Sequence, residues 1–202
     1  MVWVYTMTIW FTSDTHYGHA GILMHQRPRA AAFKDTVEMD DALIDACNAV
    51  VDRDDILYHQ GDFCWKASRA GHYRQRLNVR KLHMIRGNHD SSSLAGHCTS
   101  FKEMHTLKLQ LGAPATPRLK IALCHYPMLS WDGLHYGGIH LYGHSHGGFE
   151  TELDGFFPDR LSMDVGVDNI FRLFGQWRPI SLDEILTYLR KGKHDALSMS
   201  TE

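Results

Sequence analysis

The chain has 202 residues, of which 44% are hydrophobic and 22% are charged, and its formal net charge is -2. This composition is typical of one compact globular domain and excludes wholesale disorder. The near-balance of charge provides no basic stripe for extended duplex nucleic acid. Bound cations could still supply local positive charge for a small anionic substrate.

Four cysteines occur, with no CxxC pair among them: Cys47, Cys64, Cys98 and Cys124. Their number and spacing favour reduced thiols over a disulfide framework or a zinc knuckle. The apolar start of the chain lacks the basic segment and cleavage site of a signal peptide, and no apolar run approaches the length of a membrane span. We therefore expect a cytoplasmic protein without membrane contact, folded as a single domain over residues 1–192 with a polar tail at 193–202.

Short apolar runs of strand length recur along the chain and predict strands over residues 1–13, 56–60, 82–85, 103–111, 119–124, 139–142 and 161–167. Helical spacing predicts a helix over 36–51, where Asp35 and Glu38 resemble a capping box, and a weaker helix over 66–77. Ser181 and Glu184 resemble a second capping box, before a helix that Gly192 would stop. Strands that alternate with helices early, followed mostly by strands, indicate an α/β domain with mixed sheets.

Polar residues follow five of the expected strands directly: Asp14 and His16; Gly61 and Asp62; Gly87 to Asp90; His125; Gly143, His144 and His146. Each motif alone could be a turn. A turn has no reason to use histidine, however, and the chain contains 15 histidines. Polar groups beyond the carboxyl ends of strands gather at one edge of an α/β sheet, where ligands bind.

The ordered set Asp-x-His, Gly-Asp, Gly-Asn-His-Asp, His and Gly-His-x-His resembles the calcineurin-like metallophosphoesterase superfamily, from Asp14 to His146. Three further segments are similar to those of its small single-domain bacterial and phage members: Leu123–Pro127, Asp164–Asp168 and Arg178–Asp183. The resemblance implies a four-layer α/β/β/α sandwich of two mixed β-sheets flanked by helices. It also implies an enzyme, a metal-dependent phosphoesterase.

The resemblance implies seven metal ligands. Asp14, His16 and His146 would bind one metal ion. Asn88, His125 and His144 would bind a second ion, and Asp62 would bridge both. Carboxylate and neutral imidazole suit divalent transition metals, so we expect Mn²⁺, with Fe, Ni²⁺ or Zn²⁺ as alternatives. A structural zinc module is disfavoured, because closed zinc sites would not explain the presence of Asp14 and Asp62.

The implied reaction is in-line attack on phosphorus by a metal-bridging hydroxide. His89 would protonate the leaving oxygen, and Asp90 would orient the His89 ring. Arg86 is the candidate to hold a phosphate oxygen, because its planar guanidinium donates two parallel hydrogen bonds. A plain surface charge at the end of a strand remains the alternative interpretation of Arg86.

Further substrate contacts are expected from His19, Trp131 and Tyr136. His19 lies three residues after His16, and the two aromatic residues lie in the loop before His144. Ordinary surface or packing roles stay open for all three. Many superfamily members have an acidic residue shortly after Gly-Asp, whereas this chain has the apolar run 63–65.

The expected substrate is a small phosphorylated molecule, such as a nucleotide. Phosphodiesters are favoured, because the chain has no insertion long enough for a cap domain over the site. Phosphomonoesters of small metabolites are the alternative substrates. A non-catalytic metal-binding interaction scaffold is a further alternative, which the intact ligand set disfavours. The sequence leaves the oligomeric state open.

Overall fold

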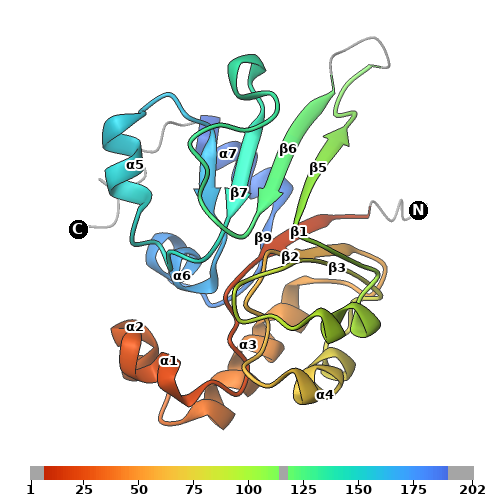
Figure 1. Ribbon diagram of the computed structural model, residues 1–202, viewed down its shortest axis with the longest axis vertical. Helices are drawn as coiled ribbons and strands as arrows, with labels where there is room; N and C mark the ends of the chain where they lie inside the picture. The colour runs from red at the N-terminus through yellow and green to blue at the C-terminus, as the bar shows by residue number, and fades with distance from the viewer. Residues whose placement is uncertain (1–6, 114–117, 191–202) are drawn as a thin grey trace, which may run out of the picture.

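The computed structural model describes residues 7–113 and 118–190. The first residues of the expected first strand, Gly192 and the expected tail at 193–202 lie outside the described residues. In the described part, two mixed sheets are flanked by helices (Figure 1). The predicted α/β architecture is therefore confirmed.

The first sheet has five strands in the order β4-β3-β2-β1-β9. Strands β1 to β4 run parallel, and β9 pairs antiparallel with β1. Their bounds are β1 Ile9–Thr12, β2 Ile56–His59, β3 Lys81–Ile85, β4 Ser100–Lys102 and β9 Ile180–Ser181. Strands β4 and β9 have no clear pattern in the sequence, because they are only three and two residues long.

The second sheet has four strands in the order β5-β6-β7-β8. Strand β5 is antiparallel to β6, whereas β6, β7 and β8 run parallel. Their bounds are β5 Met104–Leu109, β6 Leu119–Cys124, β7 Ile139–Tyr142 and β8 Ser162–Asp164. The two sheets meet just beyond β1, where the Val167 N–H donates to the Ser13 carbonyl and Ser13 forms a parallel bridge with Gly166.

The described helices are α1 Ala20–His25, α2 Arg27–Ala32, α3 Thr36–Val50, α4 Ala70–Arg76, α5 Glu150–Phe156, α6 Val167–Phe174 and α7 Leu182–Arg190. Short 3-10 turns span Ala67–Arg69, Ser92–His97 and Leu134–Tyr136. None of the helices in the described part of the chain is long and apolar enough to cross a bilayer.

Both predicted helix starts are confirmed by their caps. The Asp35 carboxylate accepts the N–H groups of Val37 and Glu38, each at 2.9 Å, which satisfies two N–H groups that have no partner inside the helix. Glu38 accepts from the Lys34 N–H instead of closing the box on Asp35. At α7 the box is reciprocal, since Glu184 accepts the Ser181 N–H and Ser181 accepts the Glu184 N–H.

The strand predicted over 161–167 is too long, because β8 ends at Asp164 and α6 begins at Val167. The Asp164 carboxylate accepts the Gly166 N–H at 2.7 Å, which turns the chain out of the sheet. Helices α1, α2, α5 and α6 were also missed. Each has only six to eight residues, which is too short to show a clear helical period.

Two hydrophobic clusters hold the layers together. The first packs α3 and α4 against the outer face of the first sheet, with Leu43, Leu57 and Leu82 nearly inaccessible. The second contains residues of both sheets, including Phe11 of β1 and Leu141 of β7. Each such buried side chain contributes about 1.5–3 kcal/mol relative to exposure. The clusters fix the sheets so that the carboxyl ends of β1, β2, β3, β6 and β7 bring their polar residues together.

Candidate metal centre

Asp62 lies at the middle of the predicted ligands. Its Oδ2 lies 3.5 Å from Nε2 of His16 and 3.6 Å from Nε2 of His125, so it faces imidazoles from both sheets. Its Oδ1 accepts the His89 backbone N–H at 2.9 Å. Asp62 is 3% exposed and follows β2 by three residues. Asp62 is therefore a neighbour of candidate ligands from both sheets.

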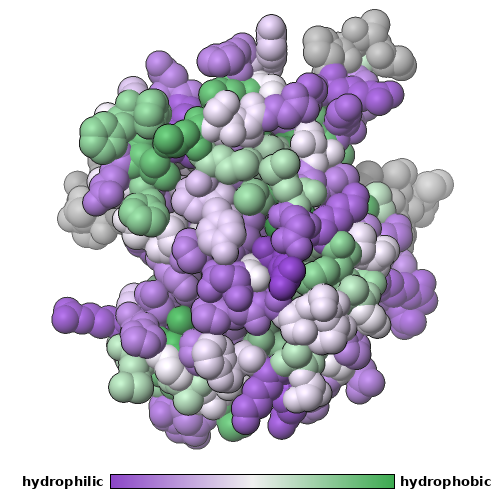
Figure 2. All heavy atoms as spheres, viewed as in Figure 1, coloured by the Kyte–Doolittle hydropathy of each residue, from purple (hydrophilic) through white to green (hydrophobic). Residues whose placement is uncertain are grey.

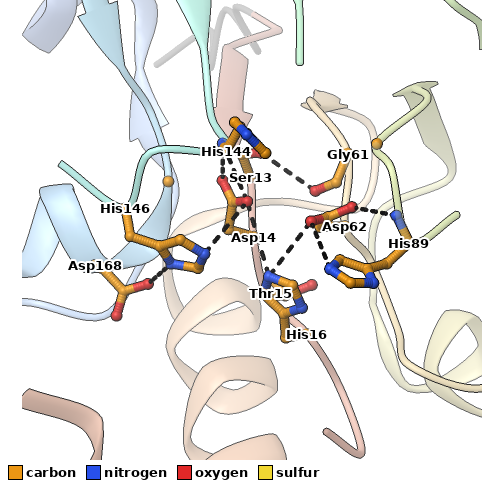
Figure 3. Close-up of polar contacts among 12 residues, drawn as sticks. Ser13, Asp14, Thr15, His16, Gly61, Asp62, His89, His144, His146 and Asp168 are labelled. Carbon is orange, nitrogen blue, oxygen red and sulfur yellow. Dashed lines mark hydrogen bonds and ion pairs between the residues drawn. The ribbon is translucent and has the colours of Figure 1, made fainter. Parts of the chain in front are cut away.

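Asp14, His16 and His146 form one compact group of donors (Figure 3). Nε2 of each histidine lies 3.9 Å from Oδ1 of Asp14. The His144 N–H donates to both Asp14 oxygens, at 3.2 and 3.0 Å, which orients the carboxylate. The structure therefore brings together the three side chains expected to share one ion.

Asn88, His125 and His144 also lie together, with His125 beside Asp62. Oδ1 of Asn88 lies 3.1 Å from Nε2 of His125 and 3.0 Å from Nδ1 of His144. Asp14, Asp62 and His125 also present one ligand atom each within 4.8 Å of one another. The three residues expected to share the second ion are therefore also neighbours.

The backbone of the site is strained. Among the described residues, the non-glycine residues with positive φ are Asp14, His16, Asp62, His144 and His146, at φ of 57°, 50°, 56°, 67° and 49°. All five are predicted ligands. Each such conformation costs about 1–3 kcal/mol and persists where the surrounding structure enforces it, commonly at functional sites. The strain turns each side chain off its strand end and towards the others.

Hydrogen bonds fix two imidazoles with Nε2 facing the centre. Nδ1 of His125 lies 2.7 Å from the Gln60 carbonyl, which only accepts, so Nδ1 carries the proton. Nδ1 of His146 lies 2.6 Å from an Asp168 oxygen in the same manner. Such outer partners are the usual means of orienting metal-binding histidines.

Nε2 of His16 is buried without a hydrogen-bond partner within the described structure. A buried polar atom without a partner is costly, unless something absent from the protein chain satisfies it. Burial lowers the pKa of His16 well below its ordinary value of 6.5, which leaves the neutral, metal-binding form. Burial raises the pKa of Asp14 above 3.8, although the charge of His146 acts in the opposite direction. A bound cation would favour the ionised form of Asp14. These donors fit a divalent transition-metal ion.

Arg29 holds two of the ligand-bearing segments in place, and nothing in the sequence singled it out. Its fully buried guanidinium donates to both Asp168 oxygens at 2.8 and 2.6 Å. It also donates to the backbone carbonyls of Asp14 at 2.5 Å and Thr15 at 3.1 Å. One side chain thus holds the Asp14 loop and, through Asp168, the ring of His146. The similarity of Asp164–Asp168 to the superfamily was the available signal for Asp168.

The family model of the calcineurin-like phosphoesterase superfamily domain matches residues 7–157, which is more than half of the chain. The chain belongs to the calcineurin-like phosphoesterase superfamily. The matched residues include all seven predicted ligands.

An uncharacterized protein from Methanocaldococcus jannaschii is 32% identical over 188 residues, covering 92% of this chain and 93% of the relative. A crystal structure of a protein of unknown function from Aquifex aeolicus superposes with a TM-score of 0.68 at 20% identity, over 90% of this chain and 99% of that one. That likeness shows the fold alone. Nuclease MPE from Pseudomonas putida matches with a TM-score of 0.33 at 19% identity, over 68% of this chain and 61% of that one, which is too weak to inform the function of this phosphoesterase domain.

The Asp90 carboxylate bonds to backbone groups and not to the His89 ring, so the expectation that it orients that ring is wrong. The carboxylate accepts three backbone N–H groups, those of Asp62, Phe63 and Gly87, at 2.8, 3.0 and 2.9 Å. Asp90 is 3% exposed, and these bonds tie the loop after β2 to the loop after β3. It therefore positions Asp62 and the loop that carries it.

His89 stands at the open side of the site, with its side chain 37% exposed and Nε2 4.0 Å from Oδ2 of Asp62. Arg86 follows the same strand, but its guanidinium donates to the Asp90 carbonyl and the Glu103 carboxylate, both at 3.2 Å. Arg86 is therefore held by two protein partners, although a guanidinium has further N–H groups with which to bind a phosphate.

His19 lies beside the ligands, with its ring centroid 5.3 Å from that of His16 and 6.0 Å from that of His89. Its Nδ1 is 3.4 Å from Nδ1 of His16. The ring stacks on Trp65, a residue that the sequence analysis noted only as part of an apolar run. The structure places His19 where it could contact both a ligand and a substrate.

Trp131 is a packing residue, which corrects its expected role in substrate binding. It is 8% exposed, its indole N–H donates to the Gly138 carbonyl at 3.0 Å, and its ring contacts His140 and Arg160. Tyr136 is 94% exposed. It lines a separate hollow of about 400 Å³ whose lining, within the described residues, includes no predicted ligand.

Proposed function

We propose that this protein is a metal-dependent phosphoesterase with two divalent ions, one on each side of Asp62, and that its preferred substrates are phosphodiesters. One observation carries the proposal: the five strained non-glycine residues of the described chain are all ligand candidates, and they surround a buried imidazole nitrogen that lacks a partner. Ordinary structural turns would not place strained backbone conformations at ligand candidates alone.

Bound divalent cations would supply positive charge for the phosphate oxygens and lower the pKa of a water molecule that attacks phosphorus. The chain supplies the geometry. His16 and His125 point Nε2 at the same Asp62 oxygen from two different sheets, which sets the spacing of the two sites. Two aspartates are the carboxylates among the proposed ligands, so the loaded centre would keep net positive charge for an anionic substrate.

His89 is the proposed proton donor to the leaving oxygen. Its ring is more than one-third exposed and lies 5.5 Å from the ring of His16, so it can reach a substrate held at the centre. A leaving alkoxide needs a proton, and a positioned imidazole contributes about 10²–10⁴-fold to such a step. Good leaving groups, which depart as stable anions, need this help much less.

An open entrance favours diesters. His89, Asn88 and His144 are exposed, and hydrophilic side chains gather across the middle of this face of the molecule (Figure 2). A diester carries a group on each side of phosphorus and needs room for both. Mn²⁺ is the first choice of metal, because the donor set mixes carboxylate and amide oxygens with imidazoles.

The test is hydrolysis of bis-p-nitrophenyl phosphate by protein loaded with Mn²⁺, compared with p-nitrophenyl phosphate. We expect about two equivalents of metal per chain, faster turnover of the diester, and loss of activity in EDTA. Asp62→Ala should lose both metal and activity. Metal binding without turnover of either ester would overturn the proposal and indicate a scaffold, and activity that survives metal removal would overturn the mechanism.

A matched variant tests the proton donor. His89→Ala should keep the metal content of the wild type but slow the hydrolysis of diesters with alkyl leaving groups by about 10²–10⁴-fold. Hydrolysis of bis-p-nitrophenyl phosphate should fall much less. Equal losses for both kinds of leaving group would contradict this role for His89.

A further inference from the structure

A flat aromatic surface borders the metal centre. The rings of His19 and Trp65 stack with centroids 3.9 Å apart and an interplanar angle of 6°. The Trp65 ring also lies 5.2 Å from that of His89, the proposed proton donor. Although His19 covers one side of the indole, Trp65 is still 45% exposed. A large apolar ring is thus presented to solvent within reach of the reacting groups.

The backbone holds this pair rigidly. The Trp65 N–H donates to the Tyr17 carbonyl at 3.0 Å, and the His19 N–H donates to the His16 carbonyl at 3.0 Å. Tyr17 is 2% exposed and stacks on Tyr73 at 4.9 Å. The two rings therefore extend from the same loops that carry His16 and Asp62, and ordering them for a ligand would cost little conformational entropy.

A hollow lies beside the two stacked rings, and a sequence neighbour of each ring residue lines it. Gly18 precedes His19, Lys66 follows Trp65, and both line a cavity of about 280 Å³. Arg69 lines it as well, with its guanidinium 5.8 Å from the Tyr73 ring. This cavity contains none of the predicted metal ligands in its described lining.

The charge of this hollow is positive. Of its two aspartates, Asp41 pairs with Arg76 at 2.7 Å, and Asp40 is 6% exposed and accepts the Gly18 N–H and the Tyr73 hydroxyl. Across the described chain, neither Lys66 nor Arg69 forms an ion pair with a carboxylate. Lys66 and Arg69 together outweigh the one carboxylate of the lining that has no cationic partner, that of Asp40, so positive charge remains at the end of the aromatic surface. Such a position is suited to a phosphate that follows a flat group.

We infer that the Trp65–His19 pair is a stacking platform for a nucleobase, and that Lys66 and Arg69 hold the next phosphate of a short single-stranded nucleic acid. The inference rests on the proposed phosphodiesterase function and names its substrate class. A base within a duplex is already stacked and paired, so an exposed indole selects unpaired bases. The overall charge of -2 agrees, because only a local cationic patch is needed.

The first experiment measures binding without catalysis. Fluorescence anisotropy of fluorescein-labelled hexathymidylate is recorded with the full-length protein in EDTA. Stacking contributes about 1–3 kcal/mol per base, so Trp65→Leu should weaken binding about 5- to 150-fold. Trp65→Phe keeps an aromatic face and should retain most of the affinity. Equal affinity of Trp65→Leu and the wild type would overturn the platform.

The salt dependence of binding tests the role of Lys66 and Arg69 separately. Lys66→Gln combined with Arg69→Gln should reduce the slope of log K against log salt by about 0.7, the value for one phosphate of a single strand. Lys108→Gln and Arg80→Gln, in hollows elsewhere on the surface, are the matched controls. A slope that falls no more than in these controls would overturn the phosphate site. Thermal unfolding checks that each variant is folded.

The second experiment separates this inference from the proposed function. Thymidine p-nitrophenyl phosphate and methyl p-nitrophenyl phosphate release the same group and differ only in the nucleoside. Wild-type Mn²⁺ enzyme should favour the thymidine ester in kcat/KM, and Trp65→Leu should lower that preference about 5-fold or more. If both esters are cleaved equally by both proteins, the inference fails and the phosphodiesterase stands. If neither ester is cleaved, the proposed function fails.

Discussion

Replacing the buried Arg29 provides a stringent test of how the site is supported. Arg29 is fully buried, and Asp168 is 5% exposed, so their pairing takes place away from water. Arg29→Met keeps the length of the side chain but leaves the Asp168 carboxylate buried without its cation. Removing one partner of a buried pair costs about 3–5 kcal/mol. For a domain of this size, that lowers the Tm by about 6–20 °C.

The pH dependence of the loss has a defined sign. Burial alone would raise the pKa of Asp168, but the charge and hydrogen bonds of Arg29 and the hydrogen bond to His146 outweigh it and hold the pKa below 3.8. A carboxyl group with a lowered pKa stabilises the folded state above its unfolded pKa, and this stability is lost as the pH falls. The difference in Tm between wild type and Arg29→Met should therefore be largest near neutral pH and shrink in acid.

Differential scanning calorimetry of EDTA-treated protein is the assay. Arg76→Met is the matched control, because Arg76 pairs with Asp41 at a similar distance, 2.7 Å, but with side chains 32% and 52% exposed. Such surface pairs contribute less than about 1 kcal/mol. Arg29→Met combined with Asp168→Leu should recover much of the lost stability, since both charges are then gone. A Tm within 2 °C or so of the wild type for Arg29→Met, or additive losses in the double variant, would refute the reasoning.

Three further predictions follow from groups around the site. Gly143→Ala should weaken Mn²⁺ binding by about 10–100-fold in isothermal titration, because an added Cβ would overlap the Asp14 carboxylate; unchanged affinity would contradict this close approach. Asp90→Ala should lower the stability in urea by at least about 2 kcal/mol, because it leaves three backbone N–H groups without their acceptor, and an unchanged unfolding midpoint would count against it. Burial lowers the pKa of His140 from 6.5 to about 4, so stability should fall by up to about 3 kcal/mol as the pH drops from 7 towards 4. Nε2 of His140 accepts the Met128 N–H and must stay neutral; His140→Gln should flatten the profile of urea midpoints, and an identical profile would exclude this residue as the cause.

The sequence predicted the metal-ligand candidates because each of them lies only a few residues beyond the end of a strand. The apolar run 139–142, for example, predicts a strand and also predicts that His144 and His146 lie at its carboxyl end. Once parallel strands are expected, their ends must share an edge, and the ligands converge without any further information. Capped helices were predictable for a similar reason, since Asp35 and Ser181 act within three residues of themselves.

The support of the site was not predictable in the same way. Arg29 and Asp168 are 139 positions apart, and nothing local marks an arginine in a six-residue helix as buried. Asp90 was assigned to its neighbour His89, although a carboxylate can serve backbone N–H groups of a distant loop as readily as an adjacent ring. Trp65 was predicted only as part of an apolar wall, because stacking on His19 depends on the pairing of two loops.

The central claim is that Asp62 lies between two metal ions. The most direct test is anomalous diffraction at the manganese edge from crystals soaked in Mn²⁺. We expect two anomalous peaks about 3.5–4 Å apart, one beside Asp14, His16 and His146 and the other beside Asn88, His125 and His144. A single peak, or peaks that do not touch Asp62, would contradict it.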